Sequence, residues 1–182
     1  GGIYGFYVDR HRVAEQEVPN SVAELWQPKW RSKFSLNSAQ QWYNVGLALM
    51  AMGRSPFHIY HLAQTQQRRA LIDLKRANGP LQEHLTALYR QAGHFWAAAP
   101  EFNKELLIVS SWGPEIAREN AKGGDWRLIQ FKEGNQVWLD TINFVKHLSG
   151  RKLEAAEIVA NYFISKPVQE RVIKELSMIA VS

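Results

Sequence analysis

The hydrophobic pattern of the first half of the chain alternates between strand and helix spacings. Residues 3–8 alternate small and aromatic side chains, which predicts a strand. Over residues 38–52 the apolar positions, Trp42 among them, recur at the helical period, and we expect Ser38 to cap this helix and Gly53 to end it. The same criteria predict a short helix over residues 21–26, a buried strand over 33–36, and helices over 60–77 and 81–91.

The second half contains a continuous aliphatic run, residues 106–109. It forms the centre of a predicted strand over residues 105–110 and indicates burial on both faces, as in a parallel sheet. Further along, the pattern predicts a helix over 114–121, strands over 127–131, 136–138 and 141–145, and amphipathic helices over 153–164 and 167–176. Strands that alternate with helices predict an α/β fold with a central, mostly parallel sheet flanked by helices.

Composition narrows the class of protein without naming a function. The chain has 182 residues, of which 46% are hydrophobic, so it is long enough to bury a substantial core. It has no cysteine, which excludes disulfides, thiol catalysis and cysteine-bound zinc. The net charge is +5, but lysine and arginine are scattered and no aromatic–basic motif occurs, so nucleic-acid binding is not predicted.

No motif of an enzyme or a cofactor site occurs. The sequence contains neither a glycine-rich phosphate loop nor a nucleophile elbow, so we predict no catalytic residues and no cofactor. His58 and His61 are three residues apart and would share a helix face. Because no carboxylate lies at a spacing typical of metal ligands, no metal site is predicted either.

The segment over residues 19–33 is the most informative part of the chain. Ser21 and Glu24 form a capping-box pattern, so a short helix begins there, and Pro28 follows its end. Trp26 supplies the large apolar anchor that so short a helix needs. The segment resembles the P-x-S-W-x-D-L-W-x-P-x-Y-K-G-K motif of solute-binding proteins of ABC importers, in particular the polyamine-binding group.

Four later segments resemble the same family in order and approximate spacing. They are residues 107–115 (strand, W-x-x-acid, helix), residues 131–134 (the P-K-E-G turn, with Phe131 in place of proline), residues 136–140 (aromatic-x-Asp at the interlobe crossing), and residues 152–169 (K-x-x-E-A through S-P-E-V-Q). The resemblance therefore extends over nearly the whole chain and implies a type 2 periplasmic binding fold, in which two lobes enclose a ligand cleft.

The resemblance also implies a domain organisation and a role. Residues 1–140 would form the second lobe, and residues 141–182 the crossing segment and C-terminal helices of the first lobe, whose N-terminal half the chain would lack. A periplasmic location, a small amine ligand and an ABC permease as partner are expected. A sensory module that reports its ligand to a membrane receptor uses the same fold, and the sequence does not separate the two roles. The orphaned C-terminal helices carry an apolar stripe, which predicts homo-oligomers; the stripe comprises Ala156, Val159, Ala160, Phe163 and Ile164.

The resemblance places Trp112, Glu115, Trp138 and Asp140 at ligand-contacting positions. Trp112 lies between a buried strand and a helix start, where open α/β sheets bind ligands. Trp138 and Asp140 are two residues apart, so on a strand their side chains point to the same face. Aromatic faces and carboxylates are the groups that bind an alkyl ammonium ion.

Each of these residues also has a purely structural explanation. Glu115 in the first turn would stabilise its helix in any protein, Trp138 would serve as core, and Asp140 would bond the backbone of a hinge. The sequence also departs from the polyamine group, because residues 37–43 contain no acid where that group has acids. Gln40 and Tyr43 in this stretch would hydrogen-bond an ammonium without neutralising it, which favours a diamine or single-amine ligand over a long polyamine.

Overall fold

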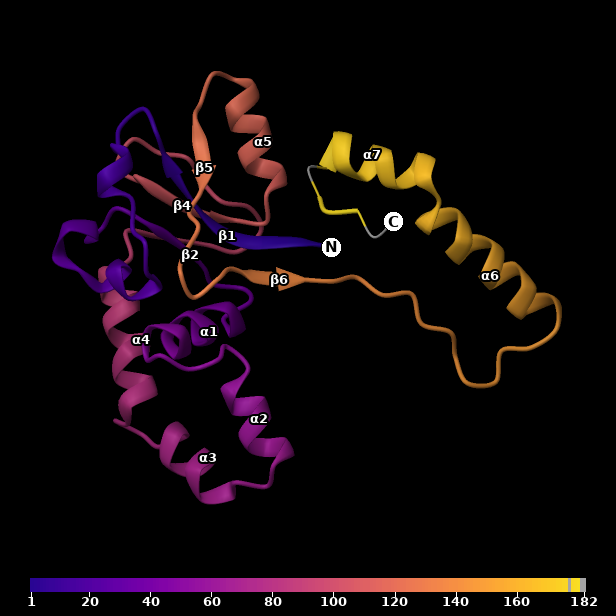
Figure 1. Ribbon diagram of the computed structural model, residues 1–182, viewed down its shortest axis with the longest axis horizontal. Helices are drawn as coiled ribbons and strands as arrows, with labels where there is room; N and C mark the ends of the chain where they lie inside the picture. The colour runs from indigo at the N-terminus through magenta and orange to yellow at the C-terminus, as the bar shows by residue number, and fades with distance from the viewer. Residues whose placement is uncertain (177, 181–182) are drawn as a thin grey trace.

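One long strand organises the sheet of the computed structural model, which describes residues 1–176 and 178–180 (Figure 1). This strand, β1 (Gly2–Asp9), pairs antiparallel with β4 (Ile108–Ser111), β5 (Trp126–Leu128) and β6 (Gln136–Trp138). Its inward positions Tyr4, Phe6 and Val8 are buried. The strand predicted over residues 3–8 is therefore present, and one of its faces packs into the core.

A second, two-stranded sheet continues the first. In it, β2 (Ser35–Asn37) and β3 (His94–Trp96) pair in parallel, and Phe34 forms a parallel bridge with Ile108 of β4. Since β4, β5 and β6 all oppose β1, every other strand of the described residues shares one direction and β1 alone is reversed. The predicted α/β fold is confirmed. The aliphatic run over 106–109 leads into β4, whose four residues are all buried, but the ladder of β4 with β1 is antiparallel, and its parallel contact is the bridge to Phe34.

Helices cover the sheets and extend below them. The α-helices are α1 (Trp42–Ala51), α2 (His58–Gln64), α3 (Arg68–Lys75), α4 (Pro80–Gln91), α5 (Pro114–Ala121), α6 (Arg151–Ile164) and α7 (Lys166–Leu176), and the 3₁₀ helices are η1 (Glu15–Glu17), η2 (Val22–Trp26) and η3 (Pro28–Trp30). The main core lies between β1, β2, η2, α1 and α4. A smaller apolar cluster joins α1 to α2, α3 and α4.

Three local predictions are wrong, and one strand was missed. The helix expected over residues 60–77 is two helices, because Gln66 between α2 and α3 has a left-handed backbone with φ of 54°. The strand β3 was not predicted, since three residues show no periodicity. Residues 141–145 form no strand. Helix α1 begins at Trp42 without a side-chain cap, while the Ser38 hydroxyl donates instead to the carbonyl of Trp96 at 3.0 Å.

Two of the sequence segments that carry the family resemblance meet at the start of η2. Ser21 and Glu24 form the predicted capping box. In addition, Glu133 accepts hydrogen bonds from the Ser21 hydroxyl at 2.5 Å and from the Val22 N–H at 3.0 Å. Burial acts to raise the pKa of the Glu133 carboxyl, but these hydrogen bonds outweigh it and hold the pKa below its ordinary value. The turn over residues 131–134 therefore fixes the short helix from 112 residues away.

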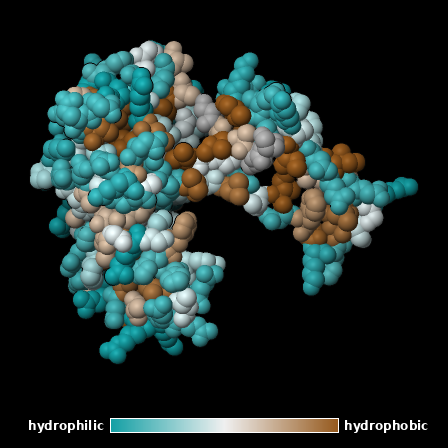
Figure 2. All heavy atoms as spheres, in the orientation of Figure 1, coloured by the Kyte–Doolittle hydropathy of each residue, from teal (hydrophilic) through white to brown (hydrophobic). Residues whose placement is uncertain are grey.

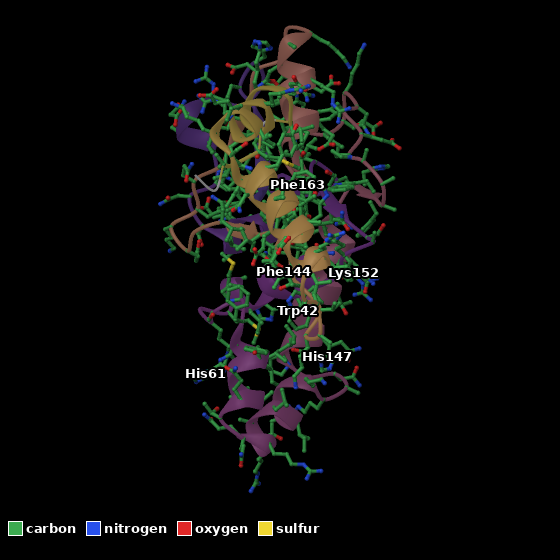
Figure 3. All side chains as sticks on the ribbon, turned by 90° about the vertical axis from the view of Figure 1, so that its right-hand side faces the viewer. Trp42, His61, Phe144, His147, Lys152 and Phe163 are labelled. Carbon is green, nitrogen blue, oxygen red and sulfur yellow. The ribbon has the colours of Figure 1, made fainter. Side chains whose placement is uncertain are left out.

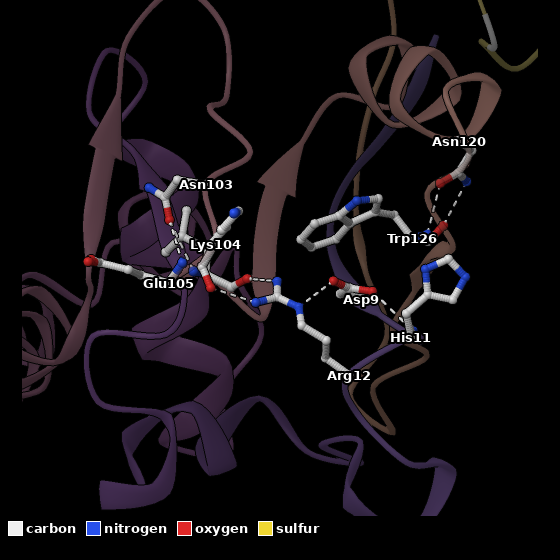
Figure 4. Close-up of polar contacts among 9 residues, drawn as sticks. Asp9, His11, Arg12, Asn103, Lys104, Glu105, Asn120 and Trp126 are labelled. Carbon is white, nitrogen blue, oxygen red and sulfur yellow. Dashed lines mark hydrogen bonds and ion pairs between the residues drawn. The ribbon is translucent and has the colours of Figure 1, made fainter.

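A side-chain clamp fixes the far end of β1. Arg12 donates from Nε to Asp9 at 2.6 Å, from Nη1 to the carbonyl of Lys104 at 2.6 Å, and from Nη2 to the carbonyl of Leu106 (Figure 4). One guanidinium thus joins the last residue of β1 to the segment that leads into β4. The clamp lies at the end of β1 opposite to the cavity described below.

Helices α6 and α7 stand away from the sheet at the end of an extended segment that follows β6 (Figure 1). Val159 and Phe163 are each 52% exposed, and apolar atoms lie along this arm in Figure 2. The tail then returns to β1, where the N–H of Ile179 donates to the carbonyl of Gly1 at 3.0 Å. Within the described residues, no helix is long and apolar enough to cross a membrane.

Candidate functional site

A cavity of about 500 Å³ opens at the end of the sheet where β1 begins. Its lining residues come from the start of α1, the β4–α5 turn, the end of β6 and the returning tail: Gln40, Tyr43, Trp112, Pro114, Glu115, Trp138, Leu139, Asp140 and Met178. All six residues that the sequence singled out lie in this lining. Their role in binding stays a prediction, but the fold does bring them together from three separate segments.

Trp112 is the centre of an aromatic cluster at the cavity wall. Its ring lies 4.9 Å from Tyr4 and 5.0 Å from Tyr43, measured between centroids. It also meets Trp96 at 6.3 Å and Trp138 at 6.2 Å, both nearly perpendicular. Such edge-to-face contacts are favourable arrangements of aromatic rings. The cluster gives the cavity a rigid aromatic wall rather than a flexible aliphatic one.

Buried hydrogen bonds hold this wall in place. The N–H of Asn37 donates to the Tyr4 hydroxyl at 3.3 Å, and the indole N–H of Trp96 donates to the Ser110 hydroxyl at 2.9 Å. Burial raises the pKa of Tyr4 to about 12, although its hydrogen bond with Ser110 opposes the shift. Tyr4 is therefore a neutral phenol at any physiological pH and adds no charge to the site.

The carboxylate of Glu115 is already engaged by the protein. Gly113, with φ of 111°, makes the turn after β4 and places Glu115 in the first turn of α5. One carboxylate oxygen accepts from the Ser111 hydroxyl at 2.9 Å, and the other pairs with Arg118 at 3.0 Å. Glu115 therefore faces the cavity with its charge largely compensated.

Asp140 differs from Glu115 in its surroundings. It is exposed, and no hydrogen bond or ion pair engages its carboxylate within the described residues. Trp138, two residues earlier, packs its indole over Gly2, where a Cβ would come within 2.8 Å of the ring. The indole Nε1 of Trp138 is buried and has no partner among the described residues. The β6 end of the cavity thus offers one uncompensated carboxylate and one unused donor.

Gln40 and Tyr43 form the α1 side of the cavity and bring no charge. The N–H of Gln40 donates to the Asn37 side chain at 2.6 Å, which shapes the turn before α1. The carbonyl of Tyr43 accepts from the side-chain amide of Gln136 at 2.9 Å and so ties α1 to β6. The absence of acids over residues 37–43 therefore leaves this wall neutral.

The sequence matches the model of one protein family over residues 1–178, and that family is described as bacterial extracellular solute-binding protein. The chain belongs to this family. No curated protein matches the sequence. The family consists of binding proteins and not of enzymes, as the sequence predicted, and its description agrees with a location outside the cytoplasm.

The fold of this solute-binding protein is similar to that of several solved structures. An ABC transporter protein from Clostridium perfringens is 19% identical with a TM-score of 0.58, over 99% of this chain and 54% of that one. The spermidine/putrescine ABC transporter substrate-binding protein PotD from Streptococcus pneumoniae is 13% identical with a TM-score of 0.56, over 97% and 50%. A two-component system protein that mediates signal transduction is 13% identical with a TM-score of 0.57, over 99% and 55%. The chain spans about half the length of these structures.

Sequence reasoning missed several residues of this candidate site. Tyr4 and Trp96 support Trp112 from below, while Leu139 and Met178 line the opening. The alternation along β1 contained a signal for Tyr4, because it shares a face with buried Phe6. Met178 is brought in only by the return of the tail, for which the sequence carries no local signal. At His58, Nε2 lies 2.7 Å from Arg54, and among the described residues no group of three or more His, Asp or Glu side chains is placed to hold a metal ion.

Proposed function

We propose that this chain binds a small organic solute with one or two amines in the aromatic cavity and serves as the solute receptor of an ABC importer in the periplasm. The observation that carries the proposal is the cavity of about 500 Å³ in which Trp112, Tyr43 and Trp138 surround a space bordered by the free carboxylate of Asp140. Its volume is typical of small-molecule sites, and aromatic faces beside a carboxylate suit an alkyl ammonium ion.

The charge of the cavity favours a ligand with few amines. Asp140 is the carboxylate available to pair an ammonium, since Glu115 is engaged by Ser111 and Arg118 and the α1 wall is neutral. A long polyamine would place further ammonium groups against uncharged side chains, where they lose hydration without gaining an ion pair. A diamine, a monoamine or an amino acid meets the available groups better.

We further propose that the chain contributes to two lobes. Residues 1–140 act as one lobe that carries the cavity, and residues 141–182 act as the crossing segment and the helices of the other lobe. The extended segment after β6 and the exposed apolar faces of α6 support this division. The polyamine-binding group remains the finer assignment suggested by the sequence segments, and PotD is one of the structures with the same fold.

An alternative role is sensing rather than transport. One structure of the same fold is a two-component system protein that mediates signal transduction. In that role the chain would report its solute to a membrane receptor instead of a permease. The genes beside its own distinguish the two, because permease and ATPase genes favour import and a sensor gene favours signalling.

Calorimetry tests the proposed ligand class. The protein would be titrated with putrescine, spermidine and a set of amino acids, with a neutral alcohol of matched length as the control. We expect a diamine or single-amine ligand to bind more tightly than spermidine and the alcohol not to bind. Tightest binding of the longest polyamine, or equal binding of the alcohol, contradicts the proposal.

A further inference from the structure

A second hollow lies on the other side of α1 from the solute cavity. It has a volume of about 310 Å³ and lies between α1, α2, α3 and α4, lined by Trp42, Val45, Ile59, Leu74, Lys75, Arg76, Leu81, Gln82 and Leu85. We call it the α1–α4 groove. It shares no lining residue with the solute cavity. Leu74 and Leu81 at its floor belong to the small apolar cluster that joins these helices.

Trp42 borders this groove and is not buried in the core. It is 54% exposed, although it belongs to the apolar positions that recur at the helical period over residues 38–52. In Figure 3 it lies between the sheet and the α2–α3 pair. An exposed tryptophan beside an apolar hollow is the kind of residue that dominates the energy of protein–protein contacts.

Part of the groove comes from a segment with a local excess of positive charge. Residues 53–79 contain five lysines and arginines and one acid, in a chain whose whole net charge is +5. No acid occurs between Glu24 and Asp73. Arg68, Lys75 and Arg76 also surround an adjoining hollow of about 410 Å³ on α3. Within the part of the chain that the structure describes, no ion pair engages these three cations.

We propose that the α1–α4 groove binds an acidic segment of a partner protein, with an aliphatic or aromatic side chain of that segment in the hollow against Trp42 and its carboxylates on Lys75 and Arg76. Charge complementarity steers such a segment to the surface, and the apolar hollow holds it there. The groove therefore serves as a docking surface that is separate from the solute site. This inference does not depend on the identity of the solute.

The shape of the groove favours a protein over an anionic membrane or a nucleic acid. Headgroups and phosphates would engage Lys75 and Arg76 but leave the hollow and Trp42 without an apolar partner. A peptide segment supplies both kinds of group from neighbouring positions of one helix, because residues three and four apart share a face. Binding that needs both Trp42 and the cations thus identifies the protein partner.

The test uses a short fluorescent helical peptide that carries glutamates on both sides of a single leucine. Binding is followed by anisotropy at low and high salt, with the double variant K75E/R76E, the variant Trp42→Ala, and R151E/K152E on α6 as the matched charge control. We expect K75E/R76E to weaken binding at least about tenfold at low salt and less at high salt. Trp42→Ala should weaken it at both salt concentrations, and the control should bind like the parent.

Two further probes separate the outcomes. A peptide with serine in place of leucine should lose most of the affinity, and vesicles containing phosphatidylglycerol should not bind in a Trp42-dependent way. Thermal melting of each variant shows whether it remains folded, and the peptide variants test the groove without altering the protein. No saturable binding at about 1 mM peptide, equal loss in R151E/K152E, or binding to vesicles that ignores Trp42 overturns the proposal.

Discussion

The rings of Trp112 and Trp138 meet edge to face, 6.2 Å apart and at 89°, at one wall of the solute cavity. Trp112 follows β4 and Trp138 ends β6, and both of these strands pair with β1. Neither tryptophan is near the other in sequence, so the contact depends on the antiparallel register of the sheet. The wall is therefore built on the sheet, and the proposed ligand would meet it preformed.

Replacing Trp112 by alanine should weaken solute binding more than replacing it by another aromatic residue. We expect Trp112→Ala to cost about 1–2 kcal/mol of binding free energy, because an aromatic face against an ammonium contributes that much when desolvated. Trp112→Phe should retain most of the affinity. Calorimetry with putrescine measures both, and Trp42→Ala, which lies outside the cavity, is the control. Equal affinity of Trp112→Ala and the parent protein would remove Trp112 from the site.

Removal of the arginine that pairs with Glu115 should strengthen the binding of a diamine. In Arg118→Ala the carboxylate of Glu115 loses its cation, so it becomes available to a second ammonium. We expect putrescine to gain several-fold in affinity and a monoamine to change little. Lys122→Ala is the matched control, because Lys122 pairs with Glu119 on the same helix. If both variants change putrescine affinity alike, the effect is one of net charge and not of Glu115.

Asp140→Asn should reduce amine affinity moderately. Asp140 is exposed, so its attraction to an ammonium is screened by water. We therefore expect a loss of no more than about fivefold, which becomes smaller as salt is added. Titrations at low and high salt measure it. An unchanged affinity at low salt would show that another group pairs the amine.

Stability should depend on pH through Glu133. Its pKa is lower in the folded protein than its ordinary value of 4.5, so its contribution is fully present above that pH and is lost as the pH falls through the lowered value. Glu133→Gln should therefore lower the melting temperature at pH 7 and approach the parent protein below pH 4.5. Glu157→Gln, on the exposed α6, is the control. A difference from the parent that stays constant with pH would contradict the role of the Glu133 charge.

The N-terminal cap of η2 can also be tested at Ser21, the residue that donates to Glu133. Ser21→Ala removes the hydroxyl that accepts from the Ala23 N–H and donates to Glu133. We expect a loss of about 1 kcal/mol in the free energy of unfolding, as is typical of N-cap residues. Urea unfolding at pH 7 measures it, and a loss as large in Ser149→Ala, on the exposed segment before α6, would be the contrary result.

The exposed apolar face of α6 should drive self-association. Val159 and Phe163 are half exposed, and a hollow of about 440 Å³ lies between this face and residues 142–148. We expect the chain to associate at micromolar concentration or above and Phe163→Glu to shift it toward the monomer. Phe57→Glu, which alters an exposed ring on the other part of the molecule, should leave association unchanged. Sedimentation that shows only monomer at high concentration would count against this prediction.

The sequence by itself determined the elements whose patterns are long or whose chemistry is local. β1 and the two C-terminal helices follow from periodicity, β4 from a continuous aliphatic run, and the start of η2 from Ser21 and Glu24, because propensity and capping act within a few residues. The six candidate site residues were also named from the sequence, four of them as tryptophans and acids at strand ends and helix starts. The structure places all six in the lining of one cavity, and their role in binding stays a prediction.

Only the tertiary structure decided which of these groups are free to act. The compensation of Glu115 requires Ser111 and Arg118 to lie around it, and the exposure of Asp140 requires the chain to leave the sheet after Trp138. The break between α2 and α3, the pairing of β3 and the exposure of Trp42 depend likewise on packing between distant segments. Burial, ion pairing and strand pairing are properties of a group's neighbours in space, and those neighbours are set by the whole fold rather than by the adjacent residues.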